Sequence, residues 1–417
     1  MPSDKKRKKK FILILILGLL SAIGPFSIDM YLPGFPNIAA DLHTTVAHVS
    51  YSLSSFFIGI SVGQLLYGPL LDRFGRKLPL YTGLIIYLVT SLACAFVASA
   101  NALIILRLLQ ALGACGGMVA ARAMVRDLFP VEEIAKVFSM LMLVIGVSPI
   151  IAPTVGGYIA ASLGWHYVFV ALTVMDAIIL ALVFFLLPES RHADASVSLK
   201  AKPILKNFIN VIREPQFFTY AFTGSIASAR LYAYIAGSPS VFMELFKVTE
   251  KQYGWIFAFN AFGLIASSQL NTLVLRTKKS EHIIRVALIC QTVTTTSFFI
   301  IAILNVLNIY STIFFIFVFL CCQGFVFPNS SALSLAPFTR NAGSASALMG
   351  AIQMGIGTLT SAIVGFLANN TTLPMTGVMA ACAISSLSIL LIGRKIIRYR
   401  ASLDKVEEET AEMISTF

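Results

Sequence analysis

The chain has 417 residues, of which 57% are hydrophobic and only 12% are charged, and its mean hydropathy is +0.84. Soluble proteins carry roughly 25% charged residues, so this composition excludes an ordinary water-soluble enzyme, a disordered chain and a secreted disulfide-stabilised domain. The formal net charge of +12 would indicate nucleic-acid binding in a soluble protein, whereas in a membrane protein the positions of the charges carry the information. The sequence therefore predicts a polytopic membrane protein.

The chain begins with a basic cluster at residues 5–10, followed directly by an apolar run. This run continues to Ile28 without a small-residue cleavage site, which favours a retained membrane helix over a signal peptide. A bilayer core of roughly 30 Å needs about 20 apolar residues per helix. Twelve runs of this size predict an all-α chain with helices at 11–33, 48–70, 79–98, 101–124, 137–160, 166–187, 216–241, 253–275, 283–304, 309–334, 344–368 and 375–397.

Lys and Arg are distributed unevenly over the segments that connect these helices. If the N-terminus lies in the cytoplasm, 27 of the 31 basic residues fall in the seven inner segments, and only Lys247 and Lys251 fall in outer ones. The remaining two, Arg107 and Arg230, lie within helices. Because cytoplasmic loops of membrane proteins are enriched in Lys and Arg, this pattern predicts a multi-pass protein of the bacterial inner membrane with both termini in the cytoplasm.

The longest polar stretch, residues 188–215, divides the chain into two halves of six helices. It predicts two pseudo-symmetric six-helix bundles, at residues 1–190 and 216–400, joined by a cytoplasmic linker at 191–215 and followed by a cytoplasmic tail at 401–417. A chain built in this way is expected to hold its binding site between the halves, near the middle of the bilayer.

Four ionisable residues fall inside the predicted helices: Asp29, Arg107, Asp176 and Arg230. The presence of each one inside a helix needs an explanation, because a charge at the centre of a membrane helix costs at least about 2.5–3.5 kcal/mol. Asp29 and Arg107 fall at a similar depth, so the pair is expected to approach and to change the proton affinity of the carboxylate as the two move. A static ion pair is the alternative. For Asp176 and Arg230, a functional and a structural role are equally open.

Residues 68–77 read Gly-Pro-Leu-Leu-Asp-Arg-Phe-Gly-Arg-Lys and connect the second and third predicted helices. Gly68 and Gly75 allow a tight turn. Asp72 lies at a helix end, where it can cap a neighbouring helix or pair with an arginine. The remaining charges are basic and favour the anionic inner leaflet: Arg73, Arg76 and Lys77.

The fourth and fifth helices carry two further patterns. Helix four has Arg107, Gln110 and Gly113 within residues 103–115. Helix five contains prolines and glycines that predict a kinked, closely packed helix between the halves. The residues concerned are Pro149, Pro153, Gly156 and Gly157.

These three patterns resemble the motifs of the major facilitator superfamily. Residues 68–77 are similar to its signature loop at every defined position, and residues 103–115 look like its proton-linked motif with Ala111 in place of a glycine. Residues 148–157 are similar to its antiporter motif, with Ser148 and Ala152 replacing glycines. The resemblance implies a twelve-helix fold and alternating access, with the 68–77 loop controlling the conformational change and helix five typical of antiporters.

Residues 26–33, together with Trp165, His166 and Tyr167, look like the bicyclomycin-resistance (Bcr/CflA) subfamily of drug:proton antiporters. In that subfamily the acid of helix one and the arginine of helix four are implicated in proton coupling. The resemblance assigns these roles to Asp29 and Arg107. It is strongest in the first half of the chain.

Residues on the helices that would surround a central cavity complete the candidate site. An apolar, aromatic pocket with few polar groups suits hydrophobic drugs. The candidates are Met30, Tyr31, Phe56, Gln110, Asp176, Arg230, Tyr234, Asn260 and Gln353.

The sequence thus predicts a secondary active transporter that exports small hydrophobic compounds in exchange for protons. A proton symporter, or an exporter of one specific metabolite, is the alternative. A channel suits two six-helix halves less well, and an enzyme is disfavoured because no set of side chains has catalytic spacing. The expected partners are a small hydrophobic molecule, protons and the lipid bilayer. We expect a monomer with no cofactor, metal, catalytic residue or nucleic acid.

Overall fold

A computed structural model of the chain describes residues 4–194, 201–338 and 342–415. Regular structure within these ranges is helical, and twelve of the helices have 18 residues or more. The first six long helices are α1 (Asp4–Asp29), α3 (Val46–Phe74), α4 (Lys77–Cys94), α5 (Ala100–Leu128), α6 (Val131–Leu163) and α7 (His166–Leu186). The second six are α9 (Pro215–Pro239), α10 (Glu250–Val274), α11 (Ser280–Ile303), α12 (Ile309–Leu335), α13 (Ala342–Phe366) and α14 (Leu373–Ser415).

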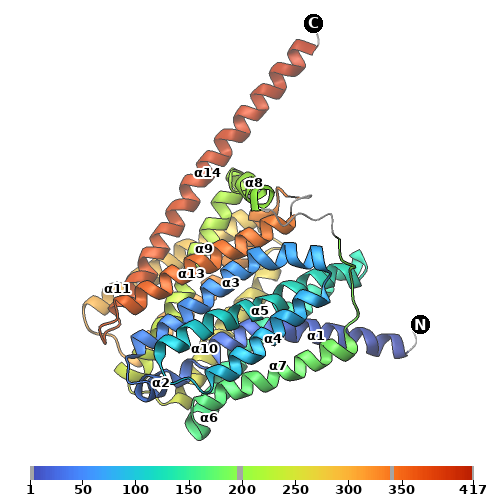
Figure 1. Cartoon of the computed structure of the whole chain (residues 1–417). Coiled ribbons are helices and arrows are strands. Elements are labelled where there is room, and N and C mark those ends of the chain that lie inside the picture. Colours follow the sequence, from blue (N-terminus) through green and yellow to red (C-terminus); the bar gives the residue numbers. More distant parts are fainter. Residues whose placement is uncertain (1–3, 195–200, 339–341, 416–417) are drawn as a thin grey trace.

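The long helices form two bundles, the N bundle (α1 and α3–α7) and the C bundle (α9–α14) (Figure 1). Within the N bundle, α5 packs against α3 and α4, and α1 packs against α5 and α6. Within the C bundle, α9 packs against α12, α13 and α14. The bundles meet mainly along two helix pairs, α3 with α13 and α6 with α10. This confirms the predicted all-α fold of twelve helices in two six-helix bundles.

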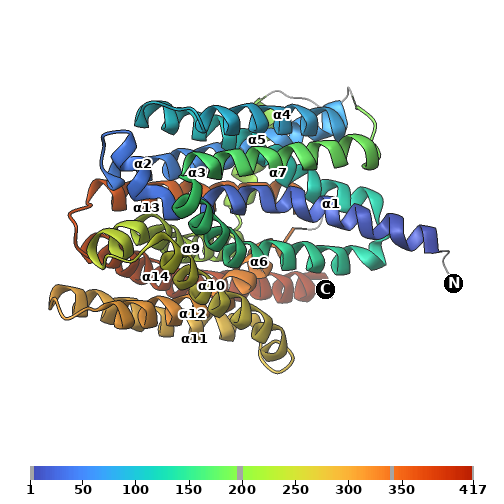
Figure 2. The same ribbon diagram turned by 90° about the horizontal axis from the view of Figure 1, so that it is seen from below.

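Both termini lie at one end of the molecule, as an even number of crossings requires (Figure 2). We call this end the terminal end and the opposite one, which carries the short helix α2 (Phe35–Asp41), the distal end. The α3–α4 connection lies at the terminal end, because α3 starts beside α2 and runs the length of the bundle.

Ten helices are long and apolar enough to cross a membrane by length and composition, and α9 and α10 are the two long helices that fall short. The reason lies in their polar residues, among them Arg230 in α9 and Asn260 in α10, both buried. Side chains of this kind are tolerated at membrane depth when they face protein rather than lipid. These polar residues face protein, those of α9 inside the C bundle and those of α10 along its contacts with α6 and α12.

Three parts of the chain differ from the predicted helix boundaries. The first helix ends at Asp29, and a 3-10 turn, Leu32–Gly34, leads into α2, because Pro33 lacks the N–H that a continuing helix needs. The segment expected as a linker contains a helix, α8 (Ala201–Ile212). The expected tail continues α14 as a helix that projects beyond the bundles (Figure 1). Arg340, counted among the inner basic residues, lies outside the described residues.

Candidate functional site

Asp29 is the last residue of α1 and lies where the two bundles meet. Its side chain is 4% exposed, and in the described part of the chain its carboxylate has no hydrogen-bond or ion-pair partner. The groups that approach it come from the C bundle: it lies within electrostatic range of the hydroxyls of Tyr232, Tyr234 and Tyr253. In the described structure, an acid without a counter-ion thus lies within electrostatic range of three tyrosines of α9 and α10.

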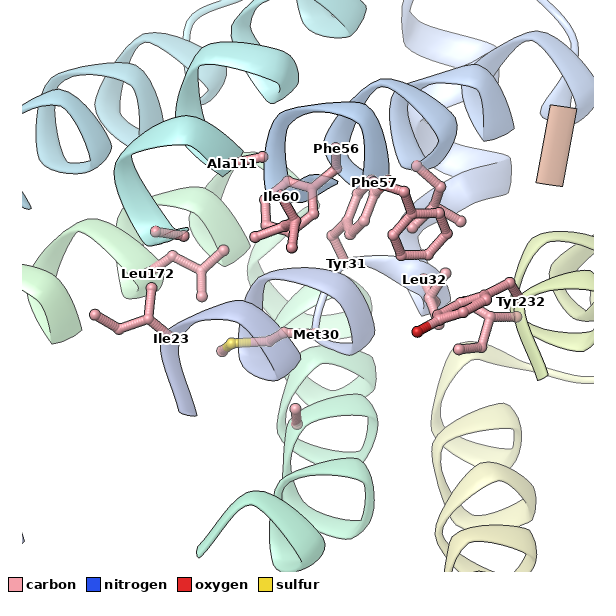
Figure 3. Packing of buried hydrophobic residues seen from close by; sticks show 14 of the residues in the cluster. Ile23, Met30, Tyr31, Leu32, Phe56, Phe57, Ile60, Ala111, Leu172 and Tyr232 are labelled. Carbon is pink, nitrogen blue, oxygen red and sulfur yellow. The ribbon is translucent and has the colours of Figure 1, made fainter. Parts of the chain in front are cut away.

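The tyrosines are held by contacts within and between the bundles. Tyr232 packs against Phe57 of α3, with ring centroids 4.7 Å apart, and Figure 3 shows its side chain pointing from α9 toward Leu32 and Phe57. Gln353 donates to the Tyr232 hydroxyl at 3.5 Å, and Asn260 donates to the Tyr234 hydroxyl at 3.4 Å.

The side-chain amide of Asn260 has an oxygen that accepts no hydrogen bond in the described structure. The residue is fully buried, and the oxygen concerned is Oδ1. Buried polar groups are nearly always hydrogen-bonded, so this carbonyl oxygen is available to a donor that the protein itself does not supply.

Arg107 is buried inside the N bundle and does not pair with Asp29. Its terminal nitrogens donate to Gln110 Oε1 at 2.5 Å and to the carbonyl oxygen of Ser27 at 2.8 Å. The guanidinium also lies 4.2 Å from the ring centroids of Tyr31 and of Phe56, a cation–π arrangement. The expectation that Asp29 and Arg107 approach each other is therefore not met in this conformation.

Helix geometry explains the separation. Ser27 and Asp29 are two residues apart on α1, which is about 200° around the helix axis, so their side chains point in nearly opposite directions. Ser27 points into the N bundle, where its hydroxyl is 2.6 Å from the Tyr87 hydroxyl of α4. Asp29 consequently points away from the N-bundle interior, toward α9.

Several residues expected along a central cavity lie instead around Arg107. Tyr31 and Phe56 cover its two sides, and Gln110 holds one terminal nitrogen while donating to Ser91 at 2.6 Å. All three are buried because a charged guanidinium inside a bundle needs donors, acceptors and rings close around it. Met30 packs near α6 at the edge of this cluster (Figure 3).

Asp176 and Arg230 are also interior to their bundles rather than between them. Asp176 of α7 is fully buried, and neither carboxylate oxygen has a hydrogen-bond partner in the described part of the chain. Arg230 of α9 is fully buried between α12 and α14, with its guanidinium 6.0 Å from the Phe319 ring. Its Nε donates to the Ala227 carbonyl at 3.1 Å, and its two terminal nitrogens lack partners in the described structure.

The 68–77 loop is organised around Arg76, which is 5% exposed. Arg76 donates to Asp127 at 2.7 Å, from the end of α5, and to Asp72 at 2.9 Å. Burial opposes the charge of Arg76, but the hydrogen bonds to these two carboxylates outweigh it and raise its pKa. Asp72 also accepts from Arg191 at 3.1 Å. The loop is thus tied to two other segments of the N bundle.

Sequence reasoning missed two members of this cluster, Asp127 and Glu189. Glu189 accepts from the backbone N–H groups of Arg76 and Lys77 at 2.9 and 3.1 Å, and so stabilises the N-terminus of α4. Both acids lie in segments assigned to the same membrane side as the loop, and this shared location was the one sign that they could contact it. The contact was not predicted because both acids are distant from the motif in sequence.

The glycines of the loop differ in their surroundings. Gly75 has φ +80°, a conformation that favours glycine, and a Cβ there would lie 3.0 Å from the Arg191 carbonyl oxygen. Gly68, in contrast, has open space where its Cβ would be. Arg73 accepts a backbone hydrogen bond from Asp194, and the Lys77 ammonium lies 5.3 Å from the centre of the Tyr81 ring.

The proline- and glycine-containing part of α6 forms the contact between the bundles at the distal end. A Cβ at Gly157 would lie 2.5 Å from the Glu250 carbonyl oxygen, and one at Gly254 would lie 2.8 Å from the Pro153 carbonyl oxygen. A Cβ at Gly156 would lie closer still to the Met30 carbonyl oxygen, within the N bundle. Pro149 lies one helical turn before Pro153. Only residues without side chains allow α6 and α10 to approach this closely.

Comparison with known proteins matches this architecture to a family. The model of the Major Facilitator Superfamily matches residues 17–362, which is most of the chain. The chain belongs to the major facilitator superfamily. Family membership confirms that it is a multi-pass membrane transporter of secondary type and not an enzyme.

Relatives within the superfamily are of the bicyclomycin-resistance type. The chain is 31% identical to a bicyclomycin resistance protein homolog of Haemophilus influenzae, over 91% of this chain and 96% of the relative. It is 28% identical to the multidrug resistance protein MdtL of Escherichia coli O157:H7, over 88% of this chain and 92% of the relative. These matches confirm the resemblance to the bicyclomycin-resistance subfamily that the motifs predicted.

Solved structures share the fold at low sequence identity. A bacterial homolog of the human lysosomal transporter Spinster, in an inward-facing and occupied conformation, matches with a TM-score of 0.67 and 13% identity, over 92% of this chain and 95% of that one. The nucleoside transporter NupG matches with a TM-score of 0.67 and 15% identity, over 93% and 99%. Both confirm the major facilitator fold.

Proposed function

We propose that this superfamily member is a proton-coupled exporter of small hydrophobic compounds, of the kind that the names of its relatives describe. One observation carries the proposal: Asp29 is buried at the end of α1, has no counter-ion in the described structure and lies within electrostatic range of tyrosines of the opposite bundle. A carboxyl group in such a place is stable when neutral and needs water or a new partner when ionised. Its protonation can therefore be linked to the approach and separation of the bundles.

The proposed substrate contacts lie on both sides of this acid. Tyr234, Asn260 and Gln353 offer hydroxyl and amide groups from the C bundle, next to the apolar surface of Met30, Phe57 and Tyr232. Asn260 Oδ1 has no hydrogen-bond partner in the described structure, and it and the Asp29 carboxylate are acceptors that can take a donor from a substrate. A largely apolar site with two such acceptors suits a hydrophobic molecule that carries a hydroxyl, amide or amine.

The other motif residues have supporting roles in this proposal. Arg107, held by Gln110 within the N bundle, provides a fixed positive charge that favours release of the proton. The 68–77 loop, through Gly68, Asp72, Arg73, Gly75, Arg76 and Lys77, controls the conformational change at the terminal end. The α6 residues Pro149, Pro153, Gly156 and Gly157 keep the distal contact tight.

We propose that the two halves of the sequence are the two parts of the protein that move relative to each other during transport. Residues 1–190 and 216–400 would move as two bodies, joined by the linker at 191–215, with 401–417 outside the membrane. The concentration of Lys and Arg in alternate connections supports cytoplasmic termini, a bacterial inner-membrane location and no role for nucleic acid. One chain supplies every group of the proposed site, which supports a monomer.

An importer that moves a nutrient together with protons, or an exporter of one metabolite, is the alternative. The close α6–α10 contact through Gly157 favours the antiporter, because Gly157 belongs to the segment that resembles the antiporter motif. The alternatives differ in the direction in which the proton gradient moves the compound, and that direction can be measured.

The test measures the accumulation of bicyclomycin, the compound in the name of the Haemophilus influenzae relative, in bacterial cells that express the chain. Wild-type cells are expected to accumulate at least threefold less bicyclomycin than cells with Asp29→Asn, and a protonophore should remove the difference. Asp41→Asn is the matched control, because Asp41 is an exposed acid of α2 and the asparagine Oδ1 can still accept its hydrogen bond from Trp165. Bicyclomycin export that persists without a proton gradient, or that Asp29→Asn leaves unchanged, contradicts the proposal.

A further inference from the structure

The N bundle contains a second acid that the proposed mechanism does not use. Asp176 lies in the middle of α7, its side chain is fully buried, and both of its oxygens lack hydrogen-bond partners in the described part of the chain. An ionised carboxylate in such a place would cost several kcal/mol. The neutral acid is therefore the form that fits this conformation.

Asp176 is separated from Arg107 by one tyrosine. The Tyr87 hydroxyl lies within electrostatic range of both residues. It is also 2.6 Å from Ser27 Oγ, and the Ser27 carbonyl oxygen accepts from Arg107 at 2.8 Å. Polar groups thus continue from α7 through α4 and α1 to the arginine of α5.

The Tyr87 proton has two possible acceptors. Ser27 Oγ donates its own proton to the Ile23 carbonyl at 2.6 Å, so in the contact between the two hydroxyls Tyr87 is the donor. Tyr87 and Asp176 are not hydrogen-bonded in this conformation, so the Tyr87 side chain must shift toward the acid before its hydroxyl can donate to a carboxylate oxygen and leave Ser27 Oγ free. Tyr87 can therefore stabilise the anion of Asp176 without any change in its own charge.

Other ionisable groups do not take this role. α7 packs against α4, α1 and α6, and among their described ionisable side chains Tyr87 is the one with an electrostatic effect involving Asp176. The others are Lys77, Tyr81 and Cys94 on α4, Lys10 and Asp29 on α1, and Glu133 and Tyr158 on α6. Lys10 and Glu133 pair with each other at 2.5 Å.

We propose that Asp176 is a second proton-binding site of the transporter. In the conformation described here the acid is neutral. In the alternate conformation α7 shifts relative to α4 within the N bundle, so that water reaches the acid and takes its proton, and the Tyr87 hydroxyl and the positive charge of Arg107 stabilise the carboxylate that remains. Asp29 binds a proton between the bundles, and Asp176 binds another within the N bundle.

Infrared spectroscopy of the purified full-length protein tests the site directly, because neutral carboxyl groups have their own C=O absorption. Wild type should show signals of two buried neutral acids, Asp176→Asn should lose one and Asp29→Asn the other. Tyr87→Phe should change the pH at which the C=O signal of neutral Asp176 disappears. Tyr81→Phe, on the same helix, should leave that pH unchanged. An Asp176→Asn spectrum identical to that of wild type contradicts the inference.

A transport measurement separates this inference from the proposed function, on which its role in coupling rests. In proteoliposomes, Asp176→Asn should move one proton fewer per bicyclomycin than wild type, and Asp41→Asn should move the same number. An unchanged number in Asp176→Asn contradicts the second site while leaving the function intact. Bicyclomycin transport by wild type without any proton movement instead contradicts the proposed function, and the infrared signals still decide whether Asp176 binds a proton.

Discussion

The two bundles each bury an arginine, and they hold it in opposite ways. Arg107 donates from both terminal nitrogens, and its Nε has no partner in the described structure. Arg230 donates from Nε, and its two terminal nitrogens have no such partner. Two aromatic rings lie 4.2 Å from the Arg107 guanidinium, whereas the one ring near Arg230 is 6.0 Å away.

The difference assigns different tasks to the two bundles. An arginine keeps its charge inside proteins, so its surroundings decide whether it is a fixed structural element or an available binding group. Arg107 is fixed by its own bundle and can act on nearby protons only through its charge. The two terminal nitrogens of Arg230 have no hydrogen-bond partner in the described structure, so the C bundle buries this charge without satisfying it.

Arg107→Met should have the largest effect. It leaves Gln110 Oε1 without its donor inside the bundle, and each buried polar group left unpaired costs about 1–3 kcal/mol. We expect a loss of about 2–4 kcal/mol in the free energy of unfolding, measured from denaturation of the purified protein, together with loss of export. A stable and active Arg107→Met protein would remove the contrast between the two arginines.

Gly157→Ala tests the surface at which the bundles meet. The added Cβ would lie 2.5 Å from the Glu250 carbonyl oxygen, so α6 and α10 must separate at the distal end. Overpacking of this kind typically costs about 1–3 kcal/mol, and export should fall severalfold. Gly146→Ala is the control on the same helix, because its Cβ would have 3.8 Å to the nearest side-chain atom. Equal transport by the two variants would contradict the assigned contact.

Arg230→Met should change stability in the direction opposite to Arg107→Met. Replacing a buried charge that lacks partners with an apolar side chain is expected to stabilise the protein by about 1–2 kcal/mol. The same variant should lose export of anionic or zwitterionic compounds while keeping that of neutral ones, measured with a panel of labelled substrates. Destabilisation together with an unchanged substrate profile would make Arg230 a structural residue like Arg107.

Arg76→Gln is expected to have the smallest effect. It removes the ion pairs with Asp72 and Asp127 but keeps a polar side chain, and ion pairs with partly exposed carboxylates contribute about 1 kcal/mol or less. Arg276→Gln, in the corresponding connection of the C bundle, should leave thermal stability unchanged because Arg276 is exposed. Similar shifts in melting temperature for both variants would show that the 68–77 loop has no special organisation.

Much of the fold could be predicted from the sequence because the bilayer imposes a strong length constraint. Even so, α9 and α10 fall below a strict hydropathy criterion, and the distribution of basic residues over the connections supported the count of twelve. The helix α8 and the continuation of α14 past residue 400 were missed, because short or charged helices outside a membrane have no comparable signal.

The candidate site was harder to predict, for a geometric reason. Depth along a helix follows from counting residues, but the direction of a side chain depends on the start and rotation of each helix. Asp29 and Arg107 were matched in depth, yet the 200° between Ser27 and Asp29 separates the acid from the arginine. In the same way, Asp127 and Glu189 are joined to Arg76 by tertiary packing that no local motif records.

The central claim is that the proton exchanged for the substrate binds at Asp29. The most direct measurement compares two kinds of bicyclomycin movement in proteoliposomes containing wild type or Asp29→Asn. Asn mimics the neutral acid, so the variant should still exchange bicyclomycin across the membrane at equilibrium but should not accumulate it against a gradient when a pH difference is imposed. Accumulation driven by the pH difference in Asp29→Asn, at the wild-type level, would contradict the account.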